Sequence, residues 1–144
     1  MVLSVKKNKY HTTLGFVLLG LFFVACSTST QQSKLQSDIE QMDKEIMDYH
    51  DEAMPKMGKL LTLRSKINKQ MDTCEDEMLK YSLQQISYNL TKADNDMMKW
   101  MHEYKSPGIN DTAMHYLSTQ RDIIKNVRNE VFTSIEKAEA VIKK

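Results

Sequence analysis

The chain has 144 residues, with 20 basic and 19 acidic side chains and a formal net charge of +1. This length suits one small domain and is too short for two ordinary ones. Because the two signs are interspersed, the sequence offers no basic face for nucleic acid and no polybasic patch for anionic lipid.

The N-terminal segment, 1–25, has the pattern of a cleaved secretory signal. Three lysines, Lys6, Lys7 and Lys9, precede an apolar run at 14–22. This run is shorter than the roughly 18–20 apolar residues that cross a bilayer. The next four residues, Phe23-Val24-Ala25-Cys26, resemble the lipobox of bacterial lipoproteins. The resemblance implies that residues 1–25 are a lipoprotein signal peptide and that Cys26 becomes the lipidated first residue.

Removal of residues 1–25 leaves 119 residues, with 17 basic and 19 acidic side chains and a net charge of −2. The following stretch, 26–33, is small and polar with nothing to bury, so we expect a flexible tether after the lipid. No acidic residue directly follows Cys26. By resemblance to lipoprotein sorting rules, this favours the outer membrane, facing the periplasm, with the lipid on Cys26 as the membrane attachment.

The rest of the chain has the spacing of packed helices. From Leu35 onward, apolar residues recur at alternating intervals of three and four. The breaks in this pattern predict three helices, over about 34–71, 74–105 and 111–143. Short connections make successive helices antiparallel. We therefore expect an all-α fold, an elongated, coiled-coil-like antiparallel three-helix bundle over 34–144.

Local signals refine these helices. Pro55 lies inside the first helix, where it removes a backbone donor, so we expect a kink there or a break between residues 51 and 56. Asp72-Thr73 is the expected turn and N-cap before the second helix. Asn110 or Asp111 is the expected N-cap of the third.

Methionine is the unusual component, with 11 in the chain and ten of them after residue 25. One group shares a face of the first helix with His50, and another lies near the end of the second. If the two helices pair about a turn near residue 73, His50 lies opposite about residue 96 and the groups meet. Thioether sulfur and imidazole suit Cu(I). The candidate metal ligands are Met47, His50, Met54, Met57, Met97, Met98 and Met101.

The same methionines occupy positions where core residues belong, and methionine is a common gap filler in helical cores. Core packing is therefore the first interpretation, a copper site the alternative, and a haem held by one His and one Met a third. We expect a partly buried His50 to find a partner in Asp94 or Gln120. Trp100 and Tyr104 are expected to pack at the end of the second helix.

Other chemically active groups are isolated. With Cys26 lipidated, Cys74 is a lone thiol without a nearby His or Cys that would support a redox role. Asp111-Thr112-Ala113 resembles an O-glycosylation motif of exported Bacteroidetes proteins, with Thr112 as the acceptor. The sequence has no phosphate-binding loop, zinc-binding helix or nucleophile elbow, so we expect no catalytic residues and no enzymatic activity.

Two segments, His50-Asp51-Glu52-Ala53-Met54-Pro55-Lys56-Met57 and Met97-Met98-Lys99-Trp100-Met101, resemble a family of small Bacteroidetes lipoproteins. Its members are often labelled viral A-type inclusion protein, and the resemblance brings no established activity. The sequence thus predicts a non-enzymatic, lipid-anchored cell-envelope lipoprotein that acts as a structural or protein-interaction module. A periplasmic copper-binding protein is the alternative. The apolar stripe also allows a homodimer seam.

Overall fold

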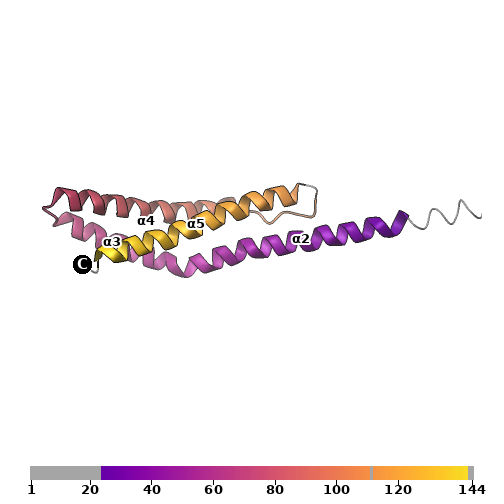
Figure 1. Cartoon of the computed structure of the whole chain (residues 1–144), viewed down its shortest axis with the longest axis horizontal. Coiled ribbons are helices and arrows are strands. Elements are labelled where there is room, and N and C mark those ends of the chain that lie inside the picture. Colours follow the sequence, from indigo (N-terminus) through magenta and orange to yellow (C-terminus); the bar gives the residue numbers. More distant parts are fainter. Residues whose placement is uncertain (1–23, 111, 143–144) are drawn as a thin grey trace, which may run out of the picture. The chain divides into compact units, whose positions relative to one another are not determined.

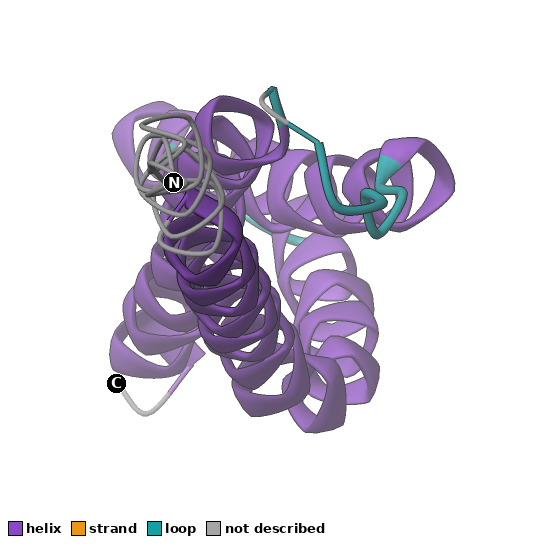
Figure 2. Cartoon of the chain, turned by 90° about the vertical axis from the view of Figure 1, so that its right-hand side faces the viewer, coloured by secondary structure: helices purple, strands orange, loops and turns teal. Residues whose placement is uncertain are grey.

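The computed structural model describes residues 24–110 and 112–142. Every regular element among these residues is helical, which confirms the all-α prediction (Figure 2). The elements in chain order are α2 (Val24–Ala53), the 3-10 turn η1 (Met54–Lys56), α3 (Met57–Asp72), α4 (Glu77–Glu103) and α5 (Ala113–Ile142). The predicted signal peptide up to Phe23 lies outside the described residues, as do the side chain of Cys26 and all of Asp111.

The apolar stripes of the sequence form the core. Most of the buried residues on each helix recur at intervals of three, four or seven, which places them on one face. The largest fully buried side chains are Ile46, Leu60, Ile67, Leu83, Leu90, Met97, Leu117, Ile124 and Val131. Each contributes about 1.5–3 kcal/mol by leaving water, so the shared core holds the helices together.

The described residues from 39 onward, 39–110 and 112–142, form one compact unit, and the described residues 24–38 belong to another. Within the compact unit, α4 reverses direction after the short connection at 73–76 and packs against both α3 and α5 (Figure 1). α3 also packs against α5. The helical part of the smaller unit carries an exposed Lys34–Asp38 ion pair, 3.0 Å long.

Residues 26–33, predicted as a flexible tether, have helical backbone as the first part of α2. The flexible tether was predicted because this stretch is composed of small and polar residues. Extending a helix that is already nucleated costs far less than starting one. The helix that residues 39–53 nucleate through their buried positions therefore continues N-terminally through these polar residues.

The predicted first helix, 34–71, is divided by η1 at Pro55. Pro55 has no N–H to donate, and the chain takes one turn of 3-10 helix before α3 continues. The N-cap of α4 is Asp76, rather than Asp72 or Thr73. The Asp76 carboxylate accepts hydrogen bonds from the backbone N–H groups of Met78 (2.9 Å) and Leu79 (3.1 Å). The second helix accordingly begins at residue 77 instead of 74.

Ion pairs fix the register between α2 and α5. Glu45 lies 3.9 Å from Arg121, and Glu52 lies 2.6 Å from Arg128. From the first pair to the second, both helices advance by seven residues. The two helices therefore run parallel with a constant register. We call this contact, together with the Lys59–Glu139 pair described next, the ion-paired seam.

Beyond η1 the seam continues on α3 with a shifted register. Lys59 pairs with Glu139 at 2.7 Å, and the separation of these partners along the chain exceeds that of the α2 pairs by about one helical turn. A 3-10 turn rises about 2.0 Å per residue, against about 1.5 Å in an α-helix. The register with α5 therefore differs on the two sides of the 3-10 turn at Pro55.

Candidate functional site

Four aromatic rings stack where α4 ends. The His50 and Trp100 ring centres are 5.7 Å apart, those of Trp100 and Tyr104 are 4.8 Å apart, and those of Tyr104 and Tyr116 are 6.3 Å apart. Trp100 is only 5% exposed. The prediction that Trp100 and Tyr104 pack at the end of the second helix is confirmed.

Hydrogen bonds tie this stack to α2 and α5. Trp100 Nε1–H donates to Gln120 Oε1 at 3.0 Å, and the Tyr104 hydroxyl donates to Asp43. Ser106 Oγ also donates to Asp43, at 3.1 Å. Burial, together with the neighbouring Asp43 carboxylate, raises the pKa of Tyr104 above its ordinary value. The hydroxyl therefore stays protonated, and the stack is a structural closure of the helix ends.

His50 has a different partner from those predicted. Its Nδ1 lies 2.9 Å from Asp51 Oδ1. Gln120 is engaged by Trp100, and Asp94 lies 4.0 Å from Arg64 on α3. His50 faces Trp100 instead of residue 96, one turn further along α4. The turn between α3 and α4 is centred later than residue 73, because α4 begins only after Asp76. This delay moves the residue opposite His50 by one turn of α4.

The predicted metal ligands occupy three kinds of environment. Met97 is fully buried, whereas Met98 is 57% exposed. Met47 and Met101 are 37% and 39% exposed. The three remaining residues are half-buried: His50, Met54 and Met57. No group of three or more His, Cys, Asp or Glu residues in the described ranges is placed to hold a metal ion. The copper site, which relies mainly on thioether sulfur, stays a prediction.

The other candidate groups lie at helix ends. Cys74 is a half-buried free thiol whose Sγ donates to the backbone oxygen of Asp76 at 3.4 Å. Thr112, the predicted O-glycosylation acceptor, is exposed. Its hydroxyl donates to Asn110 Oδ1 at 2.7 Å, and its backbone N–H donates to the same oxygen at 3.0 Å. Asn110 accepts these bonds in the turn before α5, which begins at Ala113, later than the predicted 111. Glycosylation stays a prediction.

The outer face of α4 exposes aromatic side chains on an uncharged stretch. Residues 81–91 contain no acidic or basic residue. Tyr81 and Tyr88 lie on the same face, two helical turns apart, and are 64% and 63% exposed. We call this pair the tyrosine row. Uncharged surface with exposed tyrosine is typical of the buried centre of a protein–protein interface.

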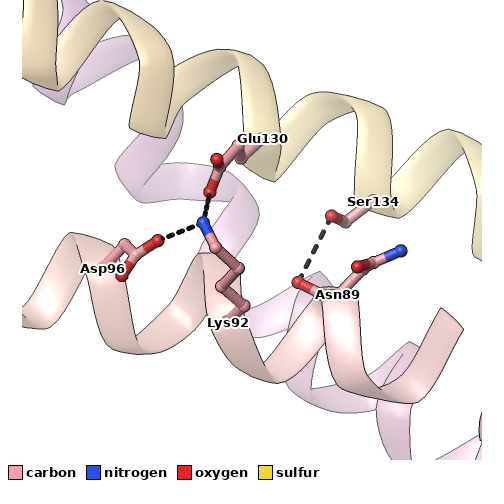
Figure 3. Close-up of polar contacts among 5 residues, drawn as sticks. All are labelled: Asn89, Lys92, Asp96, Glu130 and Ser134. Atoms are coloured by element: carbon pink, nitrogen blue, oxygen red, sulfur yellow. Dashed lines mark hydrogen bonds and ion pairs between the residues drawn. The ribbon is translucent and has the colours of Figure 1, made fainter. Parts of the chain in front are cut away.

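An open groove of about 500 Å³ lies between α4 and α5. Its lining includes amide and hydroxyl side chains: Asn89, Asn126, Asn129, Thr133 and Ser134. Ser134 Oγ donates to the backbone oxygen of Asn89 at 3.4 Å across the two helices (Figure 3). We call this space the α4–α5 groove.

Lys92 bridges the two walls of the α4–α5 groove. Its ammonium group lies 2.7 Å from Asp96 on α4 and 2.6 Å from Glu130 on α5 (Figure 3). Hydrogen bonds to both carboxylates raise the pKa of Lys92, so it stays charged. Sequence reasoning missed this groove. The one signal was a row of polar residues on α5 at intervals of three and four, which also fits a plain solvated face.

No helix in the described part of the chain is both long and apolar enough to cross a membrane. Comparison with protein-family models, with curated proteins and with solved structures finds no match for this chain.

Proposed function

We propose that this chain is a non-enzymatic, lipid-anchored cell-envelope lipoprotein that acts as a structural or protein-interaction module. The lipobox-like Phe23-Val24-Ala25-Cys26 supports the anchor on Cys26. The residues that follow favour the outer membrane, on the side facing the periplasm. In this proposal the helices after residue 38 form an antiparallel three-helix bundle that presents one face to a partner.

The tyrosine row is the observation that carries the interaction part of the proposal. Tyr81 and Tyr88 are 64% and 63% exposed, on a stretch of α4 without charged residues. Exposed tyrosine combines a large apolar ring with a polar tip and loses little side-chain entropy when it binds. Exposed tyrosine rings do not stabilise the protein while they face water, whereas a partner protein would bury their apolar surface.

Fatty-acid labelling tests the anchor. We expect cells that express the full chain to attach an alkyne-tagged palmitate analogue to it, and the labelled protein to sediment with membranes. The variant Cys26→Ala should lose the label, and Cys74→Ala, the matched control for the other cysteine, should keep it. Label that survives in Cys26→Ala would contradict the anchor.

Photo-crosslinking tests the interaction. A benzophenone amino acid at Tyr88 should give one discrete adduct with a protein in living cells. The same amino acid at Lys66, an exposed position on α3, serves as the control and should not give this adduct. Equal adducts from both positions would contradict a specific role for the tyrosine row.

Copper binding is the second candidate. The observation in its favour is that His50 contacts Trp100, which lies one turn after the buried Met97. A Cu(I) competition titration of the full chain against a chromogenic chelator decides between the two. Binding at one ion per chain, lost in His50→Ala but kept in Cys74→Ser, would favour copper handling. The interaction module predicts no site that depends on His50.

A further inference from the structure

The α4–α5 groove extends toward the end of α4. A second open space of about 300 Å³ adjoins it, and both spaces are lined by Asn126 and Glu130. Between Gln120, at one end, and Lys137, at the other, the combined groove follows almost five turns of α5. At a pitch of about 5.4 Å this is about 26 Å. The space therefore suits a chain-like ligand of several units.

The lining offers neutral hydrogen-bonding groups that the protein itself does not use. An asparagine amide donates two hydrogen bonds and accepts others. Among the described residues, the side-chain amides of Asn89 and Asn126 have no hydrogen-bond partner. Sugar hydroxyl groups both donate and accept, so paired amide groups at fixed positions complement them. Both amides stand on packed helices, which limits the entropy lost on binding.

The charged groups around the groove compensate one another. Lys92 is held between Asp96 and Glu130 (Figure 3). Across the two spaces the lining holds three lysines and three carboxylates, and hence has no net charge. A ligand with a high net charge of one sign therefore gains little electrostatic attraction along the whole groove, which favours a neutral ligand.

The far end of the groove adds apolar side chains to its charged lining. Trp100 and Ile123 line it, and Ile123 is 41% exposed. A sugar ring has one face of C–H groups that packs against such apolar surface, while its edge carries hydroxyl groups. Peptides in helical grooves are recognised by rows of apolar pockets, and the amide-lined half of the groove lacks them.

We propose that the combined α4–α5 groove binds a neutral, linear oligosaccharide. The amides of Asn89 and Asn126 hydrogen-bond its hydroxyl groups, and the exposed side chain of Ile123 contacts a ring face. This inference goes beyond the proposed function, because it needs neither the lipid on Cys26 nor the tyrosine row.

Trp100 is the only tryptophan in the chain, so its fluorescence reports on the groove. The full chain is purified in a zwitterionic detergent, since a sugar-headed detergent would compete. Neutral hexasaccharides of glucose, xylose, mannose and N-acetylglucosamine are then titrated. We expect a saturable fluorescence change with at least one of them. Asn89→Ala/Asn126→Ala should raise its Kd at least tenfold.

Asn95→Ala is the matched control, because Asn95 is an exposed asparagine of α4 that lines neither space. It should change the Kd less than twofold. Alanine is the best helix former, so unchanged circular dichroism is expected for all variants. No response to any of the four sugars would overturn the proposal, as would equal losses in the groove and control variants. A response only to an acidic polysaccharide or a peptide would overturn it as well. None of these outcomes would affect fatty-acid labelling at Cys26.

Discussion

α5 faces α2 and α3 across the ion-paired seam and α4 across the α4–α5 groove. These two contacts differ in the side chains that lie between the helices. In the ion-paired seam, long side chains such as Glu52 and Arg128 meet across the helices at 2.6 Å. The α4–α5 groove is also bridged by one such pair, Lys92 and Glu130, at 2.6 Å. Much of the rest of its lining consists of short amide and hydroxyl groups, and an open volume of about 500 Å³ remains. Both contacts share one apolar core. The open volume on one side of α5 is the basis of the ligand site that we propose there.

The largest expected effect comes from the shared core, through two neighbouring methionines. Met97 is fully buried and Met98 is 57% exposed. Met97→Ala should lower the free energy of unfolding by about 2–4 kcal/mol, because it leaves a cavity. Met98→Ala should change it by less than about 0.5 kcal/mol. Urea unfolding followed by far-UV circular dichroism measures both free energies. Similar losses in the two variants would contradict the difference in burial between Met97 and Met98.

The closure at the end of α4 should show a pH dependence. Tyr104→Phe removes the hydrogen bond to Asp43 and should cost about 1–2 kcal/mol at neutral pH. The pKa of Tyr104 is raised above its ordinary 10.0 in the folded protein. The advantage of wild type over Tyr104→Phe is therefore complete below about pH 10 and shrinks as the pH rises further, because the unfolded chain ionises first. A difference that stays constant between pH 8 and pH 11 would contradict this.

The ion-paired seam should contribute a smaller, salt-sensitive amount. Glu52 and Arg128 are partly exposed, and such pairs are worth about 0.2–1 kcal/mol. A double-mutant cycle with Glu52→Gln and Arg128→Gln should give a coupling energy in this range at low salt. It should fall in about 1 M salt, where charges are screened within about 3 Å. A coupling energy of zero at low salt would mean that the seam is closed by packing alone.

The smallest effect on stability is expected in the groove. Asn126 is exposed and makes no hydrogen bond within the described residues. Asn126→Ala should therefore leave the free energy of unfolding within about 0.5 kcal/mol of wild type. Thermal and urea unfolding test this. A loss above about 1 kcal/mol would show that Asn126 supports the fold, and the contrast between the two sides of α5 would fail.

The core could be predicted from the sequence because it depends on local periodicity. Leu83, Leu90 and Met97 repeat at heptad spacing and are all fully buried. Trp100 could be placed for the same reason. Its hydrogen bond to Gln120, however, required the register between α4 and α5.

Register explains what the sequence did not show. Asp72 and Asp76 are both good N-caps, and the choice between them moves the turn and changes what faces His50 by one helical turn. Lys92 and Glu130 lie far apart in the chain, so their contact is invisible until α4 and α5 are aligned. Polar residues on two helices do not predict a groove unless the distance between the helices is known.

The most direct test of the contrast between the two sides of α5 is side-chain NMR during titration with the hexasaccharide that changes Trp100 fluorescence. We expect saturable shifts of the side-chain NH₂ signals of Asn89 and Asn126. The Nε–H signals of Arg121 and Arg128, in the ion-paired seam, should stay in place. Shifts of the arginine signals without shifts of the asparagine amides would show that the sugar binds at the ion-paired seam and not in the groove.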